Sequence, residues 1–218
     1  MNRFRPRLDV LPGPQKKLWP ELRSVPRHFV LYGGTAIALR LGHRQSVDFD
    51  FFSAQSFGLE SLEQQWPALG AAERLQASQN TVTLLLQRDG GVKLSFFGGL
   101  TIGRVGDVQV TDDGVVQVAS LIDLTATKLK VIQQRAENRD YLDIAELLKS
   151  GVTLSDGLAA ARALYGDVFN PMVSLKALAY FEDGNLPSLP NAVKDFLRSA
   201  AQNMKAVPVL PRKSTDLA

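Results

Sequence analysis

The chain has 218 residues with no cysteine and two histidines, and its 25 Lys and Arg residues against 22 Asp and Glu residues give a formal net charge of +3. This composition excludes disulfides, thiolate metal centres and cysteine nucleophiles, and the small net charge argues against an overall basic field for nucleic acid. The sequence has no apolar run long enough to span a bilayer and no signal-peptide pattern, so we expect a cytoplasmic protein that does not enter membranes.

The first half of the chain predicts a sheet with a few short helices. An extended arm is expected over residues 2–14, which contain three prolines, and helices are expected over residues 15–24 and 56–66. Alternating or apolar runs predict strands over residues 29–32, 47–51, 73–78, 81–88 and 91–97, with further short β segments over residues 101–110 and 114–118.

From residue 120 the hydrophobic pattern changes to a helical period. Helices are expected over residues 120–135, around 141–148, and over 154–164, 170–181 and 189–204, and the tail after residue 208 is expected to be frayed. The change of period predicts two domains, residues 1–118 and residues 119–218.

The segment of residues 28–53 contains a glycine turn suited to an anion. Gly33 and Gly34 follow an apolar strand, and Thr35 is expected to cap the short helix over residues 36–41 that begins there. The first free N–H groups of a helix that starts at such a turn attract phosphate.

Two aspartates follow on the next predicted strand. Asp48 and Asp50 alternate with apolar residues, so both emerge on one face, where they repel each other unless a cation, a proton or a base lies between them. Mg²⁺ takes carboxylate oxygens, waters and substrate phosphates as ligands, and Mn²⁺ is the alternative ion. The pattern therefore predicts metal-assisted phosphoryl or nucleotidyl transfer, although each motif alone also occurs as an ordinary turn or a solvated strand face.

Gly-Gly-Thr followed by Asp-x-Asp resembles the signature of polymerase-β-type nucleotidyltransferases, and GGTAIALRLGHRQSVDFDFF is similar to the AbiEii/AbiGii toxin branch of that superfamily. The resemblance implies an α/β (α+β) fold, with a nucleotidyltransferase-like mixed-sheet domain followed by a C-terminal helical bundle. It also implies transfer of NMP from an NTP to an RNA (tRNA) or protein acceptor, with release of pyrophosphate, and a toxin role with a cognate antitoxin.

A second set of residues, within 123–144, resembles a further motif of the same family. The matching residues are Lys128, Arg135, Arg139, Asp140 and Asp143. Lys128 and Arg135 are seven residues apart, which predicts that they share a helix face and bind successive phosphates. The alternative interpretation is a salt-bridged helix pair in which Asp140 or Asp143 neutralises one of the arginines.

The sequence thus predicts one set of catalytic residues and one set of nucleotide-binding residues. The predicted catalytic residues are Asp48, Asp50, Lys128 and Asp143, with Asp48 and Asp50 as the metal ligands and Asp143 as the candidate general base or extra metal ligand. The predicted nucleotide-binding residues are Gly33, Gly34, Thr35, Arg44, Ser46, Lys128, Arg135 and Arg139. Ser95 stands where the superfamily often has a third acidic residue, which leaves open a degenerate, non-catalytic module that binds nucleotide or RNA.

Overall fold

The computed structural model describes residues 2–218, which divide into two compact units. The sheet unit comprises the chain up to Ser120 together with Ser214–Ala218, and the helical unit is Leu121–Lys213. The division falls after Ser120, and the last five residues belong to the sheet unit, whereas the predicted helical domain was residues 119–218.

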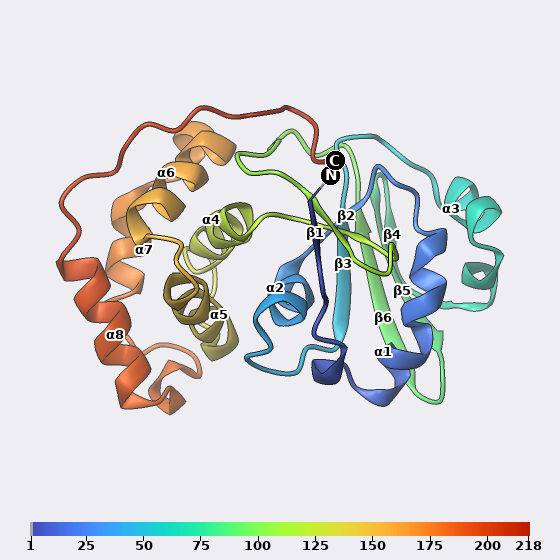
Figure 1. The fold of residues 1–218 in the computed structure, drawn as a ribbon, viewed down its shortest axis with the longest axis horizontal. Coiled ribbons are helices and arrows are strands. Elements are labelled where there is room, and N and C mark those ends of the chain that lie inside the picture. The colour runs from blue at the N-terminus through green and yellow to red at the C-terminus, as the bar shows by residue number, and fades with distance from the viewer. Residues whose placement is uncertain (1) are drawn as a thin grey trace. The chain divides into compact units, whose positions relative to one another are not determined.

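The sheet unit is built on an eight-stranded mixed sheet in the order β1-β7-β8-β2-β3-β6-β5-β4 (Figure 1). The strands are β1 (Arg3–Phe4), β2 (Val30–Tyr32), β3 (Asp48–Phe52), β4 (Glu73–Ser78), β5 (Thr81–Gln87), β6 (Gly91–Phe97), β7 (Gln109–Thr111) and β8 (Gln117–Val118). Strand β3 is antiparallel to β2 and parallel to β6. The predicted mixed-sheet fold is therefore confirmed.

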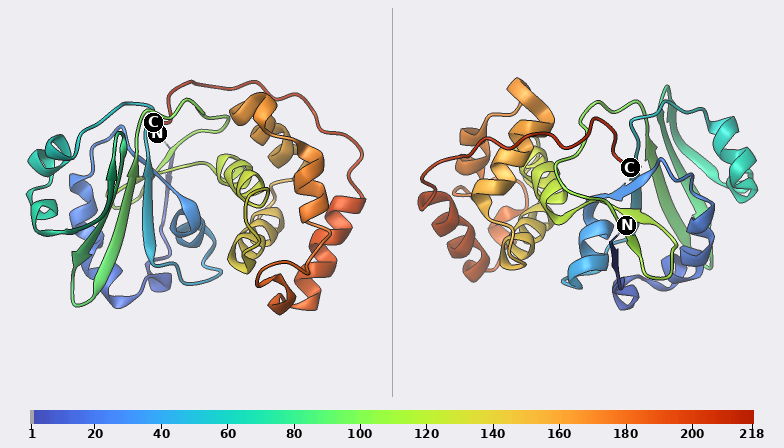
Figure 2. Two further views of the ribbon diagram at one scale, coloured as in Figure 1. Left: turned by 180° about the vertical axis from the view of Figure 1, so that it is seen from behind. Right: turned by 45° about the horizontal axis from the view of Figure 1, so that its top comes forward.

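Helices cover both faces of this sheet. They are α1 (Gly13–Leu18), α2 (Gly33–Leu41) and α3 (Leu59–Gln65), with 3₁₀ turns η1 (Leu8–Val10), η2 (Trp19–Ser24) and η3 (Pro67–Ala71). Figures 1 and 2 show α1 and α2 on opposite faces. Phe49 and Phe51 of β3 are fully buried, and the Trp19 ring lies 6.4 Å from that of Phe49, so this side of β3 belongs to the core.

Residues near both ends of the chain pack into the sheet unit, contrary to the predicted extended arm and frayed tail. β1 pairs in parallel with β7, and Ser214 forms an antiparallel bridge with Arg104. The Leu217 side chain is fully buried. Both segments are held by pairing with residues more than a hundred positions away in the sequence. The local proline-rich and polar sequence does not predict this pairing.

Of the short β segments expected over residues 101–110, the structure has an isolated bridge at Arg104 and the start of β7 (Gln109–Thr111). Gly103 has φ +65°, a conformation that interrupts an extended strand. Strands β5 and β6 form an antiparallel hairpin, and Asp89 and Gly90 both adopt positive φ at its turn.

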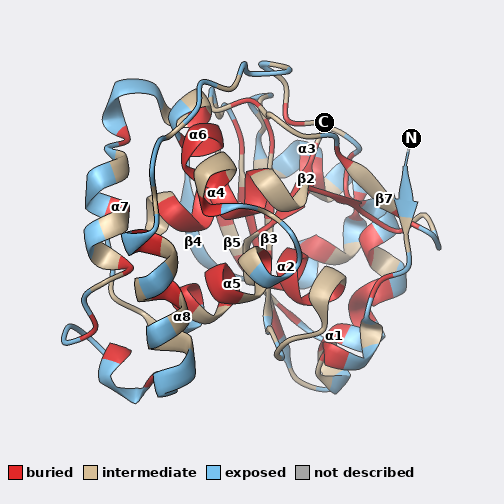
Figure 3. Cartoon of the chain, turned by 60° about the vertical axis from the view of Figure 1, so that its left-hand side comes forward, coloured by how far each residue is buried: buried red, intermediate tan, exposed pale blue. Residues whose placement is uncertain are grey.

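The second unit is all helical. Its helices are α4 (Leu121–Val131), α5 (Asn138–Lys149), α6 (Leu154–Tyr165), α7 (Pro171–Ala177) and α8 (Asn191–Gln202), with 3₁₀ turns η4 (Gly166–Val168) and η5 (Leu186–Ser188). Gly157 lets α6 approach α4 closely, because a Cβ there would lie 2.6 Å from Thr125 Cγ2. In Figure 3, α7 and α8 carry much of the exposed surface of this unit.

The predicted helical bundle is confirmed, but α4 and α7 are shorter than predicted. Helix α4 ends at Val131, four residues before the expected end, and α7 ends at Ala177. Of the helices formed by residues 2–218, none has the length and apolar character needed to cross a membrane.

Candidate active site

The glycine turn between β2 and α2 lies against the aspartate strand. Gly33 has φ +72°, and a Cβ at this position would lie 2.5 Å from Asp50 Oδ2. A Cβ on Gly34 would collide with the guanidinium of Arg44 and lie 3.2 Å from Ser46 Oγ. The turn therefore brings the first N–H groups of α2, the Asp50 carboxylate and the Arg44 guanidinium to one place, and its backbone conformation favours glycine at position 33.

Thr35 does not cap α2, which corrects the sequence prediction. The helix begins at Gly33 with Tyr32 as its N-cap, and no side chain caps it. The buried Thr35 hydroxyl donates to the backbone carbonyl of Asp48, and its oxygen lies 2.8 Å from Ser46 Oγ. Because the flexible glycines themselves form the first turn of the helix, Thr35 lies inside it and ties α2 to the start of β3.

Asp48 and Asp50 lie on one face of β3, as the alternation predicts, and both side chains are half-buried. Their neighbours on β6 are set by the parallel register, in which Asp48 pairs with Lys93 and Asp50 pairs with Ser95. Lys93 Nζ lies 3.0 Å from Asp48 Oδ2. Lys93 was not among the predicted site residues, and its only signal in the sequence is its position two residues before Ser95 on the same strand face.

Ser95 lies directly beside Asp50 and is 4% exposed. Its hydroxyl is 3.4 Å from Thr83 Oγ1, so the space next to Asp50 contains neutral hydroxyls. Among the residues that the structure describes, no three His, Cys, Asp or Glu side chains gather in a way that holds a metal ion.

In the helical unit, Lys128 joins two buried carboxylates. Its Nζ lies 2.6 Å from Asp140 Oδ1 and 2.7 Å from Asp143 Oδ2, and neither aspartate side chain is exposed. Lys128 itself is only 6% exposed. The ammonium therefore ties α4 to α5 from within the unit.

Arg135 lies beyond the end of α4, so the prediction that it shares a helix face with Lys128 is wrong. The chain turns after Val131, and Arg135 Nε and Nη2 donate to the two Asp140 oxygens at 2.7 and 3.1 Å. Arg139 Nε lies 2.6 Å from Glu137 Oε2. In the protein alone, both arginines and Lys128 are thus paired with carboxylates.

Two opposing effects act on the Asp140 carboxyl. Burial alone would raise its pKa, but hydrogen bonds from Arg135 and the charge of Lys128 outweigh burial and hold its pKa below the ordinary value. Asp140 is therefore ionised, and the cluster of Lys128, Arg135, Asp140 and Asp143 combines two cations with two carboxylates.

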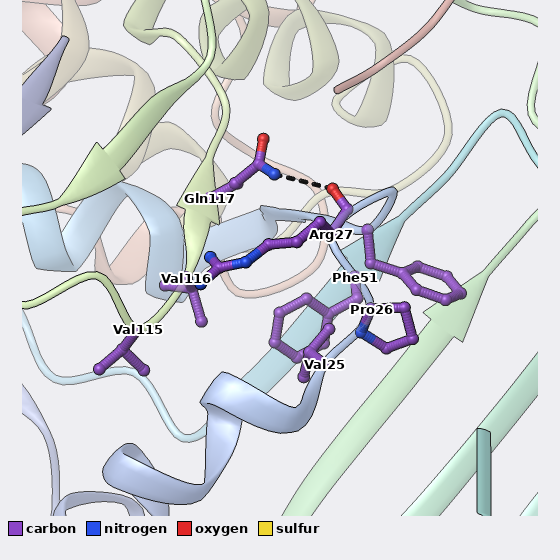
Figure 4. A pocket seen from close by; sticks show the side chains of 8 residues that line it. Val25, Pro26, Arg27, Phe51, Val115, Val116 and Gln117 are labelled. Atoms are coloured by element: carbon purple, nitrogen blue, oxygen red, sulfur yellow. Dashed lines mark hydrogen bonds between the residues drawn. The ribbon is translucent and has the colours of Figure 1, made fainter. Parts of the chain in front are cut away.

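Figure 4 shows a separate pocket in the sheet unit, lined by residues that include Pro26, Phe51 and Gln117. Gln117 Nε2 donates to the Arg27 carbonyl at 2.8 Å across one side of it. Its volume of about 10 Å³ is the room of a single water molecule, so this pocket holds no nucleotide.

Residues 22–207 match the family described as "Nucleotidyl transferase AbiEii toxin, Type IV TA system". The chain belongs to the AbiEii nucleotidyltransferase toxin family. The family match includes both the glycine turn with its aspartate strand and the Lys128 cluster. The chain is therefore a nucleotidyltransferase, as the sequence resemblance predicted.

Individual proteins are also similar to this AbiEii-family chain. An uncharacterized protein from Aquifex aeolicus is 32% identical over 158 residues, which are 71% of this chain and 74% of that protein. The nucleotidyltransferase toxin MenT4 from Mycobacterium tuberculosis has a TM-score of 0.60 at 15% identity, over 87% of this chain and 81% of its own. JHP933 from Helicobacter pylori has a TM-score of 0.53 at 18% identity, over 87% and 89%. Both structures share the fold.

Proposed function

We propose that this AbiEii-family chain transfers a nucleoside monophosphate from an NTP to a hydroxyl group of an RNA (tRNA) or protein acceptor and releases pyrophosphate. One observation carries the proposal: the Gly33 turn lies in contact with the Asp50 carboxylate, because a Cβ at Gly33 would meet Asp50 Oδ2 at 2.5 Å. An anion-binding helix start and a metal-binding carboxylate at one place are what a metal-bound triphosphate requires.

In this proposal the triphosphate binds at the turn. Gly33, Gly34 and Thr35 offer backbone N–H groups, and Thr35 and Ser46 hold the adjacent loop through their hydroxyl contact of 2.8 Å. Arg44, whose guanidinium lies against Gly34, neutralises phosphate charge from the loop side.

Asp48 and Asp50 are the proposed ligands for Mg²⁺ or Mn²⁺. Two half-buried carboxylates on one strand face fit an ion that takes its remaining ligands from waters and substrate phosphates, which is the coordination that Mg²⁺ prefers. When bound, the ion would neutralise charge on the reacting phosphates. Lys93, which is paired with Asp48, and the neutral Ser95 beside Asp50 support one ion site rather than two.

The transfer forms one bond and breaks one. The acceptor oxygen attacks the α-phosphorus, the bond between that phosphorus and the bridging oxygen to the β-phosphate breaks, and pyrophosphate leaves. The acceptor proton goes to a general base, for which Asp143 is our candidate, with an extra metal-ligand role as its alternative. Lys128 and Arg139 are further proposed phosphate-binding residues, and each would have to exchange a carboxylate partner for phosphate.

The biological partners follow from the family. Because the matching family belongs to a type IV toxin-antitoxin system, we propose a toxin role and a cognate antitoxin for this chain.

The test uses the full chain with each of four α-³²P-labelled NTPs, with Mg²⁺ or Mn²⁺, and an extract containing RNA and protein. We expect label in an acceptor with wild type and with the exposed-turn control Asp112→Asn, and none with Asp48→Asn or Asp50→Asn, which keep side-chain size. Nuclease or protease sensitivity of the product identifies the acceptor class. Nucleotide binding without any label would instead favour the non-catalytic binding module, which the neutral Ser95 beside Asp50 supports.

A further inference from the structure

The helical unit contains a hollow of about 300 Å³ that takes no part in the proposed transfer reaction. It lies between the α4–α5 connection, α5, the end of α7 and the loop before η5. Its floor is apolar and buried, and consists of Ile132, Tyr141 and Leu186. Its rim carries Gln134, Arg135, Tyr180 and Asp183. A volume of this size is at the lower end of small-ligand sites.

The loop that forms one wall is fixed to the rest of the unit. Gly184 has φ +54° and lies so close to the Ala136 carbonyl that a Cβ would collide with it. The Asn185 side-chain oxygen accepts from the Asn138 backbone N–H at 2.6 Å, and Asn138 Nδ2 donates to Ser188 Oγ at 3.1 Å. The hollow is therefore formed by the fold itself before any ligand arrives.

Two tyrosines give the hollow an aromatic character. Tyr180 lines the hollow and is 54% exposed, so its ring is accessible from solvent. Tyr141 is 2% exposed and packs edge-on against Phe181. Burial, with the nearby Asp140 and Asp183 carboxylates, raises the pKa of Tyr141 to about 12, so its hydroxyl stays protonated at neutral pH. An exposed ring beside a pocket is a surface on which a flat heterocycle stacks.

The polar groups on the rim narrow the class of ligand. Arg135 offers a guanidinium, Asp183 a carboxylate and Gln134 an amide, and together they match a planar ring with donors and acceptors at its edge and a nearby anion. Arg135 also bonds the Asp140 carboxylate, and Asp183 adds negative charge, so the rim suits one phosphate better than a triphosphate. A nucleotide within an RNA strand has this chemistry.

We propose that this hollow binds one nucleotide of an RNA strand, with its base stacked on Tyr180 and its phosphate at Arg135. The inference rests on the proposed function, because it selects RNA from the acceptor classes given there. The base and phosphate of a free NTP share this chemistry, so the experiment measures both ligands.

The test measures binding of a fluorescein-labelled, mixed-sequence single-stranded oligoribonucleotide to the full chain by anisotropy, and binding of ATP with Mg²⁺ by calorimetry. The variants are Tyr180→Ala, Tyr180→Phe, which keeps the ring, and Met172→Ala, which changes a similarly exposed residue that does not line the hollow. We expect Tyr180→Ala to weaken RNA binding by roughly 5- to 100-fold, since stacking of one base on an aromatic ring has that effect. Tyr180→Phe and Met172→Ala should bind RNA as wild type does, and ATP binding should be unchanged throughout.

Three outcomes would overturn the inference: no RNA binding by wild type, equal RNA binding by wild type and Tyr180→Ala, or loss of ATP binding in Tyr180→Ala, which would assign the hollow to the NTP. Label transfer that depends on Asp48 and Asp50, together with any of these, would leave the proposed function intact. RNA binding that depends on Tyr180, without any label transfer, would instead support the RNA site in the hollow and contradict the proposed transfer activity.

Discussion

Lys93 Nζ lies 3.0 Å from Asp48 Oδ2, across the parallel pairing of β6 with β3. The ammonium thus neutralises one of the two carboxylates that we assign to a metal ion. A metal ion that binds Asp48 has to share the carboxylate with Lys93 or displace the Lys93 ammonium. Either event lowers the affinity of the site for the metal ion.

Removing the Lys93 ammonium should therefore tighten metal binding. We expect Lys93→Met to lower the dissociation constant for Mn²⁺ by roughly 2- to 5-fold, the range of a partly exposed ion pair, as measured by electron paramagnetic resonance of free Mn²⁺. Lys17→Met, which removes another exposed lysine of the sheet unit, is the matched control and should leave the constant unchanged. Weaker Mn²⁺ binding by Lys93→Met would contradict the competition.

An acidic residue at position 95 should make the stability of the protein depend on a bound metal ion. Ser95→Asp puts a third carboxylate beside Asp50 at a position only 4% exposed, so we expect the metal-free protein to lose about 1–3 kcal/mol of its free energy of unfolding. Mg²⁺ or Mn²⁺ should restore the melting temperature of Ser95→Asp more than that of Ser95→Asn, which is similar in size but uncharged. Equal responses of both variants to metal would show that no ion binds next to this position.

The two glycines of the turn should differ in how they tolerate alanine. Gly33→Ala combines a positive φ with a collision at Asp50, so we expect it to lower the free energy of unfolding by about 1–3 kcal/mol. Gly34→Ala meets mainly the end of the flexible Arg44 side chain and should cost less than about 1 kcal/mol. Urea denaturation compares the two, and an equal loss in both would be inconsistent with the strained turn described here.

Lys128 should be essential to the stability of the helical unit. Lys128→Met leaves two fully buried carboxylates without their ammonium, and we expect a loss of about 3–5 kcal/mol in urea denaturation. Lys130→Met, two positions along α4, should cost much less, because Lys130 makes an exposed hydrogen bond to Val168. Adding Asp143→Asn to Lys128→Met should restore part of the stability, and a further loss would refute the charge-pairing role.

The ion pairs of Asp140 predict a pH dependence of stability. Its pKa in the folded protein is below the ordinary value of 3.8, so the folded state binds this proton less tightly than the unfolded chain does. The resulting stabilisation is present above the ordinary pKa and is lost as the pH falls through the folded pKa. We expect the wild-type free energy of unfolding to fall below about pH 4 and to fall less steeply in Asp140→Asn. Identical slopes in urea titrations over this range would disprove the assignment.

Much of the fold was predictable from local sequence. The hydrophobic period distinguished the mixed sheet from the helices that follow it, and the strands β4, β5 and β6 begin and end within a residue of the prediction. The errors lie where distant pairing decides the structure. Part of the proline-rich segment near the start forms strand β1 because it pairs with β7. Near the other end of the chain, Leu217 is buried in the sheet unit.

The sequence by itself determined the chemistry that the sheet unit offers: a glycine turn, two aspartates on one strand face and a serine where a third acid is often found. It did so because a strand has a period of two and a glycine pair has special backbone freedom, and both are local properties. Only the tertiary structure decided which residues neighbour them. The β3–β6 register paired Lys93 with Asp48, and the early end of α4 turned Arg135 onto Asp140. Strand register and helix packing depend on the whole core, so no local pattern specifies these contacts.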